Sequence, residues 1–421
     1  MRALGRAPWG LLLLAAGCVT HRGSWHTLGT SDHHIAPTDA EPAVEVVLLA
    51  NLAPEDRRAA KVATRVEEIL AEDRPRVVVW LGNVAGEPFR TVTPRAARRG
   101  PRCNPLESAW STPAAARLAA AVRREAPEHG FATVGELDHR CGYGPQLRAS
   151  EEGPWQMPGT HYVLRVHGDG QVRVTTSCGA GACSFAAEPT EPPSAKPLVD
   201  LVVVDLSPWL HPSADPRARR ADDLEVQALE ALLTAIGDSP AEAGPPRLLV
   251  RSVPIEAAAE HGLGTLWPDA TFSTMPPTLR SLVVRGYFAG VLSAHDRSLT
   301  ATADLFEPIK RGDRAWLEAP TFQVGAGAVS APNTRPAMSL RRRRVRFSQA
   351  YRPDIASDHA GFAVLTVRPH DADVTLHAHR HGHWETASMT VPLRPPPHAM
   401  RTPSPPMGPC RDCPQIPANE R

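Results

Sequence analysis

Polar residues follow several apolar runs of this sequence, and their types suit metal or anion chemistry. Five short blocks stand at such positions: residues 50–53 (ANLA), 82–85 (GNVA), 135–138 (GELD), 250–253 (VRSV) and 294–297 (AHDR). Because carboxylates and imidazoles bind divalent metals, Glu136, Asp138 and His295 could hold one ion. Arg251 and Arg297 could instead bind a phosphate or carboxylate, since a guanidinium group offers a planar fork of donors.

The elements that must position these blocks alternate along the chain. Nearly unbroken apolar runs at 44–50, 77–81 and 198–206 are typical of strands buried on both faces. Helical spacing of apolar residues predicts helices at 55–72, 113–126 and 222–236. Further strands are expected at 131–134, 160–166, 171–176, 247–253, 281–288, 321–324, 342–347, 361–367, 374–379 and 385–391. This order predicts an α/β fold with two stacked mixed β-sheets flanked by helices, in which loops at the carboxyl ends of strands carry ligands.

The five blocks, in this order, resemble those of the calcineurin-like metallophosphoesterases, including purple-acid-phosphatase-type members. That family has Gly-Asp-x-Gly or Asp-x-His, a second Gly-Asp block, Gly-Asn-His-Asp/Glu, a strand ending in His, and Gly-His-x-His. The resemblance spans residues 44–370 and includes the run at 202–210 and the glycine-rich turn at 324–328. It implies the family's sandwich fold, two divalent metals such as Fe, Mn or Zn, and hydrolysis of phosphate esters.

Most positions that would carry the metal ligands depart from the family pattern. Asn51 and Asn83 replace aspartates, Glu136 replaces the asparagine ligand, Ser252 replaces a histidine, and Arg297 replaces the second histidine of the last block. His295 matches, and Asp138 matches in type the acid that orients the catalytic histidine, which is itself Leu137 here. Two dications about 3.5 Å apart repel by roughly 20 kcal/mol at an effective dielectric constant of about 20, and neutral asparagine does not offset this as a bridging carboxylate does.

We therefore expect a catalytically inactive, metal-free relative that binds a ligand or a partner. An ion pair between Glu136 and Arg297 could replace the metals. The alternative is a divergent hydrolase that keeps one or two divalent metals. Asn51 and Asn83 also suit turns, and His295 could be a hydrogen-bonded loop histidine, so these residues have purely structural interpretations as well.

The amino terminus predicts export and a lipid anchor. Arg2 and Arg6 precede a short apolar run that is too short for a membrane span. The run ends in LAAGC at residues 14–18, which resembles the lipobox of bacterial lipoproteins and implies acylation of Cys18. We expect a signal peptide at 1–17, a tether at 18–43, the phosphoesterase-like domain at 44–393 with loop insertions near 84–112 and 178–197, and a disordered proline-rich tail at 394–421. The protein would then be an exported lipoprotein at the periplasmic face or outer membrane; a plain secretory signal is the alternative.

The net charge limits which binding partners are expected, and the cysteine content predicts disulfides. Lys+Arg number 46 and Asp+Glu 45, for a net charge of +1, so a basic nucleic-acid binder is disfavoured. The membrane, an envelope protein and a small anionic ligand remain as expected partners. Six cysteines besides Cys18 suggest disulfides in an exported chain: Cys103, Cys141, Cys178, Cys183, Cys410 and Cys413. Their connectivity stays open, although Cys178 and Cys183 could close a small loop and Cys103 could pair with Cys141.

Two basic clusters have structural and functional interpretations. His377, His379, His381 and His383 alternate, and on one strand they would share a face that could chelate a transition metal. Gly382 predicts a hairpin turn that breaks this alternation, so we expect a solvated histidine patch. The run Arg341–Arg344 could contact lipid headgroups, but balanced overall charge favours a solvated strand end.

Overall fold

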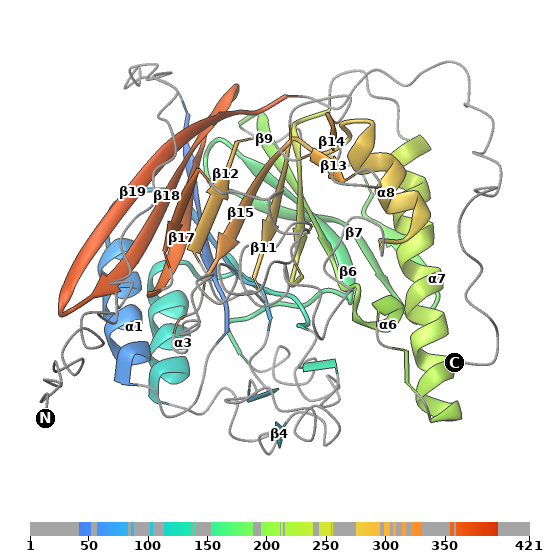
Figure 1. Cartoon of the computed structure of the whole chain (residues 1–421), viewed down its shortest axis with the longest axis horizontal. Helices are drawn as coiled ribbons and strands as arrows, with labels where there is room; N and C mark the ends of the chain where they lie inside the picture. The colour runs from blue at the N-terminus through green and yellow to red at the C-terminus, as the bar shows by residue number, and fades with distance from the viewer. Residues whose placement is uncertain are drawn as a thin grey trace, which may run out of the picture.

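The computed structural model describes residues between 42 and 394, arranged as two β-sheets with helices on their outer faces (Figure 1). The described residues are 42–51, 57–82, 86–87, 102–103, 113–135, 138–139, 153–187, 195–210, 212–213, 215–238, 244–253, 255, 275–294, 299–303, 306–308, 314–316, 321–327, 329, 354–357 and 359–394.

The smaller sheet has six strands in the order β19-β18-β17-β1-β2-β5. Its parallel half consists of β1 (Val44–Leu49), β2 (Arg76–Trp80) and β5 (Gly130–Ala132). Its antiparallel half consists of β17 (Ala360–Val367), β18 (Asp371–Arg380) and β19 (His383–Pro392). All six residues of β1 are buried, because β1 lies between β17 and β2 with packed layers on both faces.

The larger sheet has nine strands in the order β16-β12-β15-β11-β10-β9-β6-β7-β8. Its parallel centre consists of β9 (Pro197–Val204), β10 (Arg247–Arg251), β11 (Gly290–Ser293) and β15 (Phe322–Ala326). Antiparallel strands complete both sides: β6 (His161–His167), β7 (Val172–Gly179), β8 (Ala182–Phe185), β12 (Leu299–Thr302) and β16 (Ile355–Ser357). Two short antiparallel pairs lie apart from both sheets: β3 (Gly86–Glu87) with β4 (Arg102–Cys103), and β13 (Phe306–Pro308) with β14 (Arg314–Trp316).

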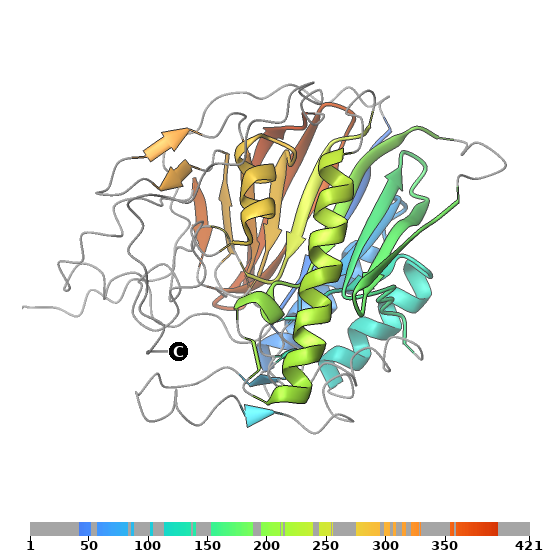
Figure 2. The same ribbon diagram turned by 90° about the vertical axis from the view of Figure 1, so that its right-hand side faces the viewer.

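Helices cover the outer face of each sheet (Figures 1 and 2). On the smaller sheet lie α1 (Arg57–Leu70) and α3 (Pro113–Glu125). On the larger sheet lie α7 (Pro216–Asp238) and α8 (Pro277–Val284), preceded by the short α6 (Ser207–Leu210). A continuous apolar core fills the space between the sheets. The predicted architecture, two stacked mixed sheets flanked by helices, is confirmed.

The strand predicted at 281–288 is wrong, because residues 281–284 belong to helix α8 and residues 285–288 form a turn and irregular backbone. Its valines favour a strand when taken alone. Pro277 stands in the first turn, and Leu279, Leu282 and Val283 are buried at helical spacing. Packing of these side chains against the layer that contains α7 therefore determines the element.

One of the loop insertions expected from the sequence is partly regular. The start of the loop insertion expected near 178–197 is regular, since β7 and β8 form a hairpin up to residue 185.

The predicted turn at Gly382 is confirmed: β18 and β19 pair on either side of it, with φ of 47° at His381 and 88° at Gly382. His377 stacks on Phe362, with ring centroids 4.7 Å apart. Within the described ranges, no group of three or more His, Cys, Asp or Glu side chains is arranged to hold a metal; Arg341–Arg344 lie outside these ranges.

Candidate functional site

The loops that follow the parallel strands of the two sheets meet at one end of the sandwich. Within the smaller sheet, the Asn51 N–H donates to the carbonyl oxygen of Gly82 at 3.3 Å. Between the sheets, the Val329 N–H, just beyond β15, donates to the carbonyl oxygen of Ala50 at 2.9 Å. The carboxyl ends of both sets of strands thus converge on one edge, which is where the predicted site residues would have to meet.

Asn51 links the two sheets through its side chain. Its Nδ2 donates to the carbonyl oxygen of Gly327 at 2.8 Å, and the residue is 5% exposed. Its φ of 54° lies in the left-handed region, which asparagine tolerates better than most residues. Asn51 therefore contributes a neutral hydrogen-bond donor at the position where the resemblance implies an anionic metal ligand.

A close backbone contact requires glycine at position 82, after β2. Gly82 has a φ of 83°, and a Cβ atom added to it would lie 2.4 Å from the backbone nitrogen of Gly135. No side chain fits at that distance. Gly82 is thus explained by the packing of the loops after β2 and β5, without any ligand.

Asp138 is fully buried and already engaged by the backbone. One carboxylate oxygen, Oδ2, accepts the N–H of Gly135 at 2.9 Å. This hydrogen bond holds the Asp138 carboxylate against the backbone just beyond β5, which gives the residue a structural contact.

Ser252 follows β10 and is buried, with 1% of its surface exposed. Its carbonyl oxygen accepts the N–H of Ala294 at 3.0 Å, which joins the loops after β10 and β11. Its hydroxyl oxygen has no hydrogen-bond partner in the described part of the chain. Arg251 precedes it and is equally buried, and burial lowers the pKa of its guanidinium group to about 9.

The other four predicted site residues, Asn83, Glu136, His295 and Arg297, lie outside the described residues. The proposed ion pair between Glu136 and Arg297 therefore stays a prediction. The same holds for a single metal held by Glu136, Asp138 and His295.

A buried acid that the sequence analysis did not select lies after β9. Asp205 is 1% exposed, and its Oδ1 accepts the N–H of Ser207 at 2.8 Å. Burial raises the pKa of Asp205 to about 7; the Ser207 hydrogen bonds oppose this rise, and the charges of Glu225 and Asp138 add to it. Asp205 follows an apolar strand like the other blocks, so the same strand-end rule applied to residues 198–206 would have identified it.

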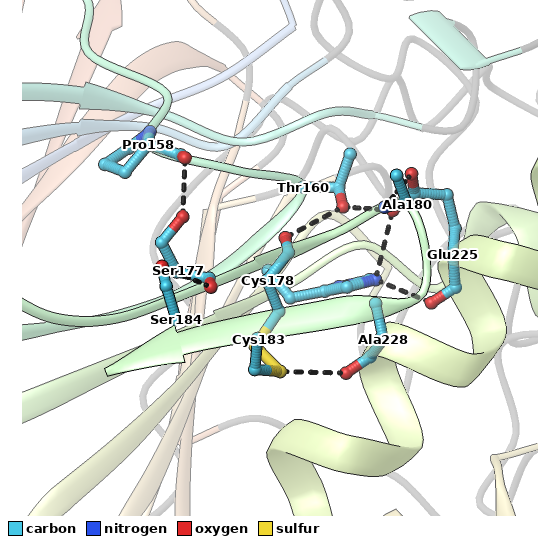
Figure 3. Close-up of a disulfide and its surroundings, with 10 residues drawn as sticks. Pro158, Thr160, Ser177, Cys178, Ala180, Cys183, Ser184, Glu225 and Ala228 are labelled. Atoms are coloured by element: carbon cyan, nitrogen blue, oxygen red, sulfur yellow. Dashed lines mark hydrogen bonds and ion pairs between the residues drawn. A yellow bond between two sulfur atoms is a disulfide. The ribbon is translucent and has the colours of Figure 1, made fainter. Parts of the chain in front are cut away.

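His161 and Glu225 extend this polar cluster toward α7. The Asp205 N–H donates to Nδ1 of His161 at 3.2 Å, so the ring proton is on Nε2, which lies 3.1 Å from the carbonyl oxygen of Glu225. Burial lowers the pKa of His161 to about 4, which keeps the ring neutral. The carboxylate of Glu225 accepts the Thr160 hydroxyl and, at 3.0 Å, the Ala180 N–H (Figure 3). The cluster can hold a proton on a carboxyl group near neutral pH.

A disulfide joins the hairpin beside this cluster. Cys178 and Cys183 are bonded and are direct partners in the β7–β8 ladder, which confirms one of the predicted disulfides. Cys183 Sγ also lies 3.6 Å from the carbonyl oxygen of Ala228 in α7 (Figure 3). Cys141, Cys410 and Cys413 lie outside the described residues, as does the side chain of Cys103.

The described site residues do not fit a pair of bridged metals. The Asn51 amide donates to a carbonyl oxygen, and Asp138 accepts a backbone N–H. Ser252 offers an uncharged hydroxyl where the family pattern has an imidazole. The described ligand positions Asn51 and Ser252 are both neutral, and anionic ligands are what a pair of dications requires.

No family model matches this sequence, and no curated protein is significantly similar to it. Several solved structures are similar in fold. GAP50, described as the anchor in the inner membrane complex of Plasmodium, is 14% identical and covers 84% of this chain and 90% of its own, with a TM-score of 0.53. PhoD is 12% identical over 83% of this chain and 68% of its own, with a TM-score of 0.46. Vps29 from Cryptosporidium parvum is 10% identical over 83% and 97%, with a TM-score of 0.31.

Sequence identities this low are evidence for a similar fold only. The similarity to GAP50 agrees with the strand order and the flanking helices: the chain has an α/β fold of two stacked mixed β-sheets flanked by helices. Residues 1–41, which include Cys18, are outside the described ranges. None of the described helices has the length and apolar character needed to cross a membrane.

Proposed function

We propose that this protein is a cell-envelope lipoprotein whose phosphoesterase-like domain binds a ligand or partner and does not hydrolyse phosphate esters. The lipid anchor rests on the sequence around Cys18. The loss of catalysis rests on the chemistry of the residues at the converging strand ends.

The observation that carries the proposal is the hydrogen bond from Asn51 Nδ2 to the carbonyl oxygen of Gly327. It ties the loop after β1 to the loop after β15 with neutral groups. Metals that bridge two such loops in a phosphoesterase need anionic ligands, and an amide that donates a hydrogen bond there stabilises the loops in their absence. The description of GAP50 as an anchor agrees with a binding role for a protein of this fold, and it belongs to GAP50 alone.

The test is a metal and activity assay on the full chain, purified in detergent. The protein is stripped with chelator and reloaded separately with manganese, iron or zinc. Metal content is then measured by elemental analysis, and hydrolysis of an aryl phosphate monoester and diester is followed. We expect substoichiometric metal and no turnover above the metal-only blank.

About two metals per chain together with turnover would overturn the proposal in favour of the divergent hydrolase. The Asn51→Asp variant restores a carboxylate at one ligand position, and we expect it to remain inactive because the other positions stay altered. The Asp223→Asn variant, which changes an exposed acid of α7, serves as the matched control for removing charge elsewhere.

A further inference from the structure

The guanidinium group of Arg251 is buried, and two of its nitrogen atoms have no hydrogen-bond partner in the described part of the chain. Arg251 is the last residue of β10 and is 1% exposed. Its Nε and Nη1 atoms have no hydrogen-bond partner, and no described acidic residue forms an ion pair with it. A charged group taken out of water without a partner is strongly unfavourable, so the described part of the chain leaves this group incomplete.

The other two buried arginines in the described ranges, Arg76 and Arg247, have partners, as does the half-buried Arg165. Arg76 donates to the carboxylate of Glu45 at 2.7 Å. Arg165 donates to both oxygens of Asp200, at 2.8 and 2.9 Å. Arg247, in the same strand as Arg251, donates to a carbonyl oxygen at the end of α7. The unpaired state of Arg251 is therefore specific to its position and not a general feature of arginines in this fold.

The strand direction shows which layer Arg251 enters. Val250 packs in the core between the sheets, whereas Leu249 packs in the layer between the larger sheet and helices α7 and α8 (Figure 2). Because successive side chains of a strand point to opposite faces, Arg247 and Arg251 lie on the same side as Leu249. Arg251 thus extends into the helix-covered layer at the carboxyl edge of the sheet, next to the loop that contains Ser252.

We propose that Arg251 binds a small oxyanion, a phosphate or carboxylate group, at the carboxyl end of β10. An anion supplies the charge and the acceptor atoms that the guanidinium group lacks, and its oxygens match the planar fork of donors. Since only 1% of Arg251 is exposed, the ligand is either a free small anion or the small anionic end of a larger molecule. This inference deepens the proposed function by naming a ligand class.

The test measures anion-dependent stability of the full chain in chelator, at constant ionic strength set with potassium chloride. Inorganic phosphate, phenyl phosphate and acetate are titrated separately while thermal unfolding is followed by circular dichroism. We expect a saturable rise in Tm with at least one anion, and calorimetry to give one site per chain. A response to both phosphates assigns a phosphate group, and a response to acetate assigns a carboxylate.

Three variants at the two ends of β10 locate the site. Arg251→Met should lower the affinity for the anion by at least about tenfold. Arg251→Lys keeps the charge but not the fork, so it should lower the affinity by less. Arg247→Met is the matched control on the same strand and face: it should lower the Tm but keep the anion response.

The inference is overturned if no anion changes the Tm of the unmodified protein, or if Arg251→Met responds like the unmodified protein. These outcomes are distinct from failure of the proposed function. That failure would appear as bound metal and turnover, whereas the anion response is measured with metals removed.

Discussion

The two edges of the sandwich differ in whether their buried charged groups have partners from the chain. At the edge where the parallel strands begin, Glu45 pairs with Arg76 at 2.7 Å and with Arg74 at 2.8 Å. On the same edge, Arg368 pairs with Asp371 and Asp373 in the hairpin between β17 and β18. Buried charges there are neutralised by partners from the chain itself.

At the opposite edge, where these strands end, several buried polar groups lack this compensation. Arg251 has no described counter-ion, and the Ser252 hydroxyl has no described hydrogen-bond partner. Asp205 has a pKa raised to about 7, because burial and nearby acids disfavour its charged form. The charged groups at the first edge are therefore explained by the stability of the fold. At the second edge, buried polar groups without described partners cost folding free energy, which indicates a binding function.

The largest effect should come from breaking a pair at the first edge. Glu45→Leu removes the buried carboxylate partner of Arg76 and leaves only the exposed carboxylate of Glu72, so we expect the free energy of unfolding to fall by about 4 kcal/mol. Urea unfolding measures this change. The double variant Glu45→Leu/Arg76→Met should recover much of the loss; a single-variant loss of less than about 1 kcal/mol would mean that this pair is not important for stability.

The next effect should be a pH dependence that comes from Asp205 at the second edge. Its folded pKa of about 7 exceeds the ordinary value of 3.8, so the folded state binds this proton more tightly than the unfolded chain does. The resulting stabilisation is full below pH 3.8 and is lost as the pH rises through 7, by an amount on the order of 4 kcal/mol.

Asp205→Asn should remove this component from the pH profile of unfolding free energy. Asp223→Asn, at an exposed position of α7, should leave the profile unchanged. An Asp205→Asn profile that follows the unmodified protein between pH 4 and 7 would contradict the assignment.

A smaller effect should follow from opening the disulfide of the β7–β8 hairpin. Cys178→Ala/Cys183→Ala removes a short covalent loop, and loop entropy predicts a loss of about 2 kcal/mol. Addition of a reductant should not lower the free energy of unfolding of this variant further through the loss of this bond. The β6–β7 ladder does not depend on the disulfide, so far-ultraviolet circular dichroism should show little change.

The smallest effect has the opposite sign and tests the comparison most directly. In anion-free buffer, Arg251→Met removes an unpaired buried charge, so we expect stability to rise by about 1 kcal/mol. Arg76→Met, which removes a paired arginine, should lower it. If Arg251→Met proved as destabilising as Arg76→Met, the two edges would not differ in the way described.

Sequence patterns predict most of the fold because buried strands and amphipathic helices have strong local signatures. The run at 44–50 corresponds to β1, and the helix at 113–126 corresponds to α3. The segment at 281–288 is mispredicted because its valines favour a strand locally, whereas contacts with distant residues make its first half, residues 281–284, part of α8.

The site is predicted less completely. Strand-end reasoning identifies Asn51, Asp138 and Ser252, and the structure places Asn51 and Asp138 in hydrogen bonds with loop backbone. The pairing state of Arg251 cannot be read from sequence, since it depends on which acids lie nearby in space. Asp205 is missed because it lies in the run at 202–210 that resembles the family's central strand, and this resemblance predicts a structural element and not a site.

The position of β1 has a consequence for how the protein acquires its fold. β1 is the first strand in the described part of the chain, and on one side it is hydrogen-bonded to β17, a strand that begins at Ala360. Such pairing at long sequence separation is slow to form. The smaller sheet cannot form completely until the chain has been synthesised as far as β19, and a product truncated before Ala360 would keep the edge of β1 unpaired and prone to aggregation.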